Sequence, residues 1–294
     1  MDTPAKLNVA VDRDDRKQQK MPGQKRDYNG KAKEAPKAVA ARNEFTPAFE
    51  WFRDELDDHH DRRERIVKAS RDITALSKKI IFSLQRVRKI NSSFPANIET
   101  EIETRLADIS ALLVSIAPEI QGINRYRYAR NMSCIEELIE ALTFAHYLRT
   151  QSLMGYSESV EKVAALSKSP DQMDVENAEG AANPPVLVTE QDYLMGIFDL
   201  SGEMMRFATT SAALNGSLDG PGDRTIVADM QELGSVFEIL PQQYGKSYAM
   251  KLDTLRQSVL KVEKLGYGLK VRGSERPSGW MPDTNDDGFR GAEE

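Results

Sequence analysis

Glycine and proline gather in a few places along this chain, and long segments with helical patterning lie between them. The clusters lie in the first 50 residues, at 168–185, at 215–222 and after 273. Both residue types interrupt regular structure, so the segments between the clusters are where long helices can form. Those segments lack the strict alternation of apolar and polar residues that marks a half-buried strand. The sequence therefore predicts an all-α protein.

Apolar side chains in these segments recur at steps of three and four, which is the period of an amphipathic helix. The longest apolar stripe, in the first segment, consists of Phe52, Leu56, Ile66, Ile73, Leu76, Ile80, Leu84 and Val87. Thr189 and Asp192 have the spacing of a helix-capping box, with Thr189 as N-cap. The predicted helices span residues 49–90, 96–116, 123–153, 159–166, 190–213, 224–239 and 243–271.

The ends of the chain differ in composition from this helical middle. We expect a disordered tail over 1–44, a helical domain over 45–272 with a flexible loop at about 167–188, and a second disordered tail over 273–294. The basic pairs at 16–17 and 25–26 have the spacing of a two-part nuclear import signal, although charged tails often contain such pairs.

Charge and cysteine content exclude several classes of protein. The net charge is −6, so this chain alone has no general basic field with which to coat nucleic acid. The only cysteine, Cys134, rules out an internal disulfide framework and is expected to be a buried, unreactive residue. Without an apolar run long enough to cross a membrane, we expect an intracellular protein of the cytoplasm and nucleus.

Two acidic pairs stand on two of the predicted helices, Glu137 with Glu140 and Asp199 with Glu203. Spacings of three and four place both carboxylates of a pair on one helix face. Apolar neighbours place them beside the core, where an ionised carboxylate is costly unless a cation neutralises it. Gly196, on the same stripe as the second pair, allows another backbone or a ligand to approach. Four converging carboxylates would form a site for hard divalent cations, whereas the alternative is solvated acids paired with lysines.

Other candidate sites have weaker patterns. The segment 283–294 fits the letters of an EF-hand loop but lacks an exiting helix, and His59 and His60 belong to a charged surface stretch. No Glu-x-x-His motif of a di-iron bundle occurs in the sequence. The second half of the first helix is basic enough to contact phosphate, and its candidate contacts are Lys78, Lys79 and Arg86.

Five stretches together resemble the translin family. The stretches are 64–74, 137–141, 192–196, 199–206 and 269–275, and the last of them favours the translin-associated branch over translin itself. The resemblance implies a bundle of about seven helices that assembles with translin into a closed, barrel-like hetero-oligomer. It also implies the catalytic subunit of a Mg²⁺-dependent endoribonuclease, active only in that complex, with Mn²⁺ as a possible substitute.

The acidic residues of that family's active site match Glu137, Glu140, Asp199 and Glu203 one for one, so Asp192 is better interpreted as a helix cap. The implied substrate is single-stranded RNA or a short or nicked RNA duplex, and hydrolysis by water would leave a 5′-phosphate and a 3′-hydroxyl. Two alternatives remain open at this point. The chain could be a non-catalytic partner that stabilises translin and modulates its binding of nucleic acid, or a scaffold that binds proteins through its tails.

Overall fold

The computed structural model describes residues 43–168, 184–221, 224–241 and 245–272. The chain divides into two units, Met1–Arg53 and Asp54–Glu294, and the helical bundle belongs to the second unit. In the described ranges, the regular structure is helical apart from one isolated bridge between Asp219 and Thr225. The eight α-helices of these ranges are α1 (Thr46–Leu84), α2 (Ala96–Ile116), α3 (Ile123–Arg127), α4 (Cys134–Thr150), α5 (Tyr156–Leu166), α6 (Glu190–Asn215), α7 (Ile226–Ile239) and α8 (Lys246–Arg272). The predicted all-α fold is confirmed.

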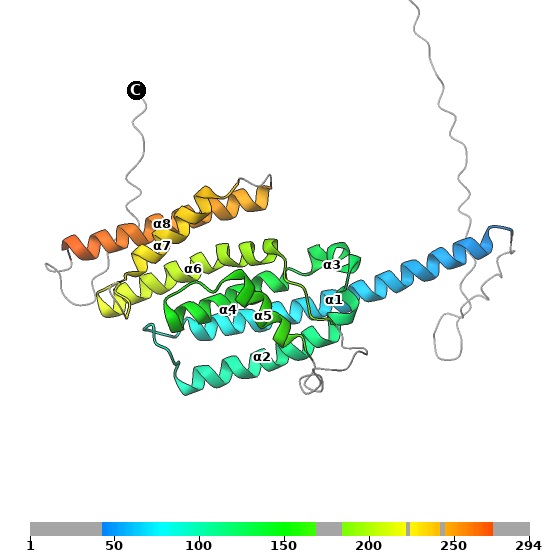
Figure 1. The fold of residues 1–294 in the computed structure, drawn as a ribbon, viewed down its shortest axis with the longest axis horizontal. Helices are drawn as coiled ribbons and strands as arrows, with labels where there is room; N and C mark the ends of the chain where they lie inside the picture. The colour runs from blue at the N-terminus through cyan, green and yellow to red at the C-terminus, as the bar shows by residue number, and fades with distance from the viewer. Residues whose placement is uncertain (1–42, 169–183, 222–223, 242–244, 273–294) are drawn as a thin grey trace, which may run out of the picture. The chain divides into compact units, whose positions relative to one another are not determined.

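Helices α4 and α6 form the centre of the bundle. They pack along each other, while α7 and α8 run side by side next to α6, and α5 packs on α2 (Figure 1). Most of α4 is buried, including Ile135, Leu138, Ile139 and Phe144, which are at most 1% exposed. Among the described helices, none is long and apolar enough to cross a membrane.

The apolar stripe of the first helix predicts its buried face correctly only in part. Ile66, Ile73 and Leu84 are fully buried, as expected of core positions. Phe52 and Leu56 continue the same stripe but are 50% and 67% exposed. Periodicity shows that a helix has an apolar face, but it does not show that another element covers that face.

The helix predicted over 123–153 is divided in the structure. A short 3₁₀ turn, Ala129–Asn131, separates α3 from α4. On α3, the buried Arg125 side chain donates to the Leu187 carbonyl oxygen (2.9 Å) and pairs with Asp192. The break between α3 and α4 has no signal in the local sequence, because neither glycine nor proline lies between residues 123 and 153.

Most of the predicted tails and of the predicted loop lies outside the described residues. This applies to residues 1–42 and 273–294, and with them to the import-signal pairs and the EF-hand-like segment. Of the loop at about 167–188, the structure describes only the two ends, and residues 184–189 contain no regular structure.

Candidate functional site

The two acidic pairs lie on neighbouring helices, since α4 carries Glu137 and Glu140 and α6 carries Asp199 and Glu203. Gly196 explains how the helices come so close. A Cβ atom at Gly196 would lie 2.7 Å from Ile139 Cγ2 and 2.8 Å from the carbonyl oxygen of Glu136. No side chain fits in that space, so the prediction that Gly196 permits a close approach is confirmed.

Glu140 is the buried member of the four acids. It is only 8% exposed, and burial raises the pKa of its carboxyl group to about 8, with further contributions from Asp199, Glu137 and Glu203. Within the described ranges, no group donates a hydrogen bond to this carboxyl group and no cation pairs with it. We call these four residues the carboxylate site.

The other three members of the carboxylate site have partners in the chain. Lys251 Nζ donates to Asp199 Oδ2 at 2.6 Å, and Lys78 Nζ lies 3.6 Å from Glu137 Oε2. These partners partly neutralise the site. Burial still raises the pKa of Glu137, against the opposing effect of Lys78.

Glu203 is held from two sides. Gln85 Nε2, just beyond the end of α1, donates to Glu203 Oε2 at 2.9 Å, and Arg206 Nε lies 3.6 Å from Glu203 Oε1. The Gln85 contact joins positions 118 residues apart in the chain, and it fixes one carboxylate oxygen of Glu203.

The donor chemistry of the carboxylate site suits a hard cation. Every member offers carboxylate oxygen, the ligand type that Mg²⁺ and Mn²⁺ prefer, and no described residue donates a hydrogen bond to the buried carboxyl group of Glu140. In the described part of the chain, however, no three acidic, histidine or cysteine side chains form a preassembled metal-binding group. Binding a cation would therefore take rotation of side chains away from their present partners.

Asp192 has the structural role expected from its spacing. Its backbone N–H donates to Thr189 Oγ1 at 3.2 Å, and its Oδ2 accepts from the Thr189 N–H at 2.8 Å, which completes a capping box. The buried Arg125 neutralises the same carboxylate. These contacts separate Asp192 from the carboxylate site.

The three candidate nucleic-acid contacts lie in different surroundings. Lys78 stands beside Glu137 at the edge of the carboxylate site, and its side chain is 64% exposed. Arg86 Nη2 instead pairs with Glu101 Oε2 at 2.5 Å, and Lys79 is exposed. Only Lys78 is brought to the carboxylate site.

Sequence reasoning missed Lys251 and Gln85. Lys251 reaches the carboxylate site only because α8 packs on α6, and Gln85 only because the end of α1 lies near Glu203. No local pattern distinguishes either residue from other polar residues of its segment. The missing signal is the tertiary packing itself.

Two other candidates from the sequence have structural roles. Cys134 is fully buried, and burial raises the pKa of its thiol to about 11, so it is unreactive as expected. His59 is half-buried rather than fully exposed, and its Nδ1 lies 3.0 Å from Tyr128 Oη, which links α1 to the segment after α3.

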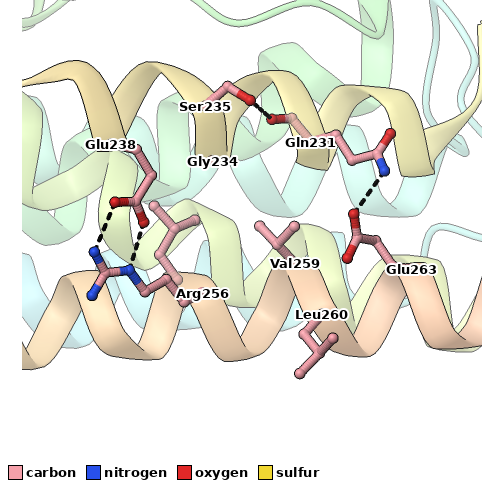
Figure 2. Close-up of a pocket in the computed structure, with 9 residues that line it drawn as sticks. Gln231, Gly234, Ser235, Glu238, Arg256, Val259, Leu260 and Glu263 are labelled. Carbon is pink, nitrogen blue, oxygen red and sulfur yellow. Dashed lines mark hydrogen bonds and ion pairs between the residues drawn. The ribbon is translucent and has the colours of Figure 1, made fainter.

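A groove of about 520 Å³ lies between α7 and α8 and contains no member of the carboxylate site. Figure 2 shows that its polar side chains pair with one another: Arg256 donates two hydrogen bonds to Glu238, and Gln231 donates one to Glu263. Its polar side chains are thus engaged within the chain, and they do not indicate a ligand.

Comparison with known proteins identifies the family. The family model described as "Translin family" matches residues 61–273. The chain belongs to the translin family. It is 34% identical over 242 residues to translin-associated protein X of Mus musculus, covering 80% of this chain and 82% of that protein. The resemblance seen in the sequence is confirmed.

More distant translin-family relatives agree with this assignment. The chain is 24% identical over 231 residues to the translin-associated protein X homolog of Schizosaccharomyces pombe, covering 78% of this chain and 89% of that protein. A solved structure described as apo-NeC3PO matches with a TM-score of 0.53 at 16% identity, covering 74% of this chain and 95% of that chain. At that identity the structural match supports the translin-like fold alone.

Proposed function

We propose that this chain is the catalytic subunit of a hetero-oligomer with translin that hydrolyses phosphodiester bonds in RNA with the help of Mg²⁺. The observation that carries the proposal is Glu140, a buried carboxyl group that receives no hydrogen bond from the described residues and whose pKa is raised by burial and by the charges of the other three acids. A translin partner is supported by the relatives, which are called translin-associated protein X. Single-stranded RNA or a short duplex is the substrate that the family resemblance implies.

In this proposal Glu137, Glu140, Asp199 and Glu203 hold the cation, and Mn²⁺ is an acceptable substitute. The cation would supply charge stabilisation and activation of water at the scissile phosphate. The close contact of α4 and α6 at Gly196 would help to hold the two carboxylate pairs near each other. Lys78, exposed at the edge of the site, would bind the neighbouring phosphate of the RNA backbone.

The proton balance of the reaction also involves these side chains. Water attacks phosphorus, the bond to the 3′-oxygen breaks, and the products are a 5′-phosphate and a 3′-hydroxyl. One of the four carboxylates accepts the proton that water loses, and the departing 3′-oxygen takes up a proton from solvent.

The test is RNA cleavage by the assembled translin complex with Mg²⁺. Glu140→Gln and Asp199→Asn should each reduce cleavage at least about a hundredfold, because losing even an indirect supporter of a metal ligand costs about 10–100-fold. Glu190→Gln, an exposed acid at the start of α6, is the matched control and should cleave like the wild type. Full cleavage by correctly assembled Glu140→Gln and Asp199→Asn complexes would refute the assignment.

One observation favours the alternative function, a non-catalytic assembly partner of translin. Asp199 and Glu137 already have counter-ions from their own chain, so the bundle can be stable without metal. For such a partner, the same substitutions would leave both assembly and cleavage unchanged. The cleavage assay therefore separates the two functions directly.

A further inference from the structure

Lys251 is the cation held most closely at the carboxylate site. Its Nζ donates to Asp199 Oδ2 at 2.6 Å and to the Met195 carbonyl oxygen at 3.2 Å, and lies 3.8 Å from Glu136 Oε2. These oxygens belong to α6 and α4, whereas Lys251 comes from α8. One ammonium group thus contacts oxygens of two neighbouring helices at the place where the two acidic pairs meet.

The two other basic residues at the site are held less closely. Lys78 and Arg206 lie 3.6 Å from Glu137 and Glu203, and their side chains are 64% and 60% exposed. The Lys251 side chain is only 24% exposed, so water screens its charge less. Among the described basic residues that pair with the carboxylate site, Lys251 is therefore the least exposed and the closest to its partner.

We propose that Lys251 is a built-in counter-ion, which stabilises the carboxylate site without metal and competes with a divalent cation for Asp199. The inference rests on the proposed function, because it concerns the same site. Lys251 and the cation compete for the same carboxylate oxygen, and two positive charges a few ångströms apart repel each other. Metal entry therefore requires Lys251 to leave Asp199, which lowers the apparent affinity for the cation.

Direct binding of Mn²⁺ to the metal-free translin complex tests this competition, with free Mn²⁺ measured by electron paramagnetic resonance. If Lys251 leaves Asp199 unpaired about a tenth of the time, Lys251→Met should bind Mn²⁺ about tenfold more tightly than the wild type. Lys251→Gln, also uncharged, should show the same gain, and Lys251→Arg should keep the wild-type affinity. Lys264→Met is the matched control, an exposed lysine further along α8, and should also bind like the wild type.

Melting temperatures of the same complexes, with and without Mn²⁺, give a second test of the competition between Lys251 and the cation. In EDTA, Lys251→Met and Lys251→Gln should melt below the wild type, because Asp199 has lost its partner. Saturating Mn²⁺ should raise their melting temperatures more than that of the wild type, because the cation replaces the missing charge. A merely structural role for Lys251 predicts the same loss with and without Mn²⁺, and that result would overturn the inference.

The outcomes separate this inference from the proposed function. One outcome is that Glu140→Gln abolishes Mn²⁺ binding but the uncharged Lys251 variants bind Mn²⁺ no more tightly than the wild type. In that case the carboxylate site binds the cation, and the proposed competition between Lys251 and the cation is wrong. If neither the wild type nor the uncharged Lys251 variants bind Mn²⁺, both proposals are wrong. Tighter binding in Lys251→Met and Lys251→Gln, with unchanged binding in Lys264→Met, supports the competition.

Discussion

The buried carboxyl group of Glu140 should make the stability of this protein fall as the pH rises. Its pKa is about 8 in the folded chain and 4.5 as a free side chain, so the folded state binds the extra proton between these values. Each pH unit in that window costs about 1.4 kcal/mol of unfolding free energy. Its contribution to stability is complete below pH 4.5 and is lost as the pH rises through about 8. Glu140→Gln cannot ionise and should lack this loss.

The magnitude follows from the same pKa values. Between pH 5 and pH 8, Glu140→Gln should gain roughly 3 kcal/mol on the wild type, which for a chain of this size is about 6–12 °C in melting temperature. At any one pH, the difference in unfolding free energy between the two proteins also contains the effect of replacing the carboxyl group with an amide. The change of this difference with pH is therefore the quantity to measure.

Thermal unfolding of both complexes in EDTA, at half-unit steps from pH 5 to pH 9, measures this change. EDTA is needed because a bound cation would stabilise the ionised carboxylate and hide the loss. Groups that titrate in both proteins largely cancel in the difference between the two curves. Parallel curves across pH 5–8 would refute the reasoning, because they would mean that Glu140 ionises as easily in the folded chain as in the unfolded one.

Four further substitutions test the packing and capping of the helices by thermal or urea unfolding. Gly196→Ala should cost about 1–3 kcal/mol, because its Cβ would overlap Ile139 and the backbone of α4, whereas Gly202→Ala, with open space on the same helix, should gain about 0.5–1 kcal/mol. Equal effects at the two glycines would contradict the close packing. Thr189→Ala should cost about 1 kcal/mol by removing the cap of α6, and no loss would mean that the cap is dispensable. Tyr147→Phe removes a donor to the buried Asp229 and should also cost about 1 kcal/mol, and a neutral result would show that the remaining partners suffice.

Much of the fold could be predicted from the sequence because helical periodicity is a local signal. The predicted segments 96–116 and 190–213 agree with α2 and α6 to within two residues at each end. The division between α3 and α4 could not be predicted, because no glycine or proline marks it; Arg125 of α3 contacts Asp192, 67 residues further along the chain. The first helix also shows this limit, since its spacing predicts an apolar face but not the exposure of Leu56.

The acidic pairs could be predicted because spacings of three and four place side chains on one helix face. Gly196 also has a local signal, since a glycine inside a helix costs about 1 kcal/mol and calls for a reason. The partners of the acids have no such signal. Lys251 lies 52 residues from Asp199, and Gln85 lies 118 residues from Glu203, so their contacts exist only once α1, α6 and α8 have packed.

Glu140 differs from the other buried acids of the described chain in its hydrogen-bond partners, and this difference supports a functional role for it. Asp229 is 6% exposed and accepts hydrogen bonds from Tyr147 and Gln151, and Asp192 is 8% exposed and pairs with Arg125. Glu140 is as buried as these two structural acids, yet it faces three carboxylates and receives no donor from the described residues. Stability alone would favour an amide or an apolar residue there, because a buried charge without a partner is costly. The bundle therefore bears an unfavourable carboxyl group in the carboxylate site, and this is the observation that supports the proposed cation.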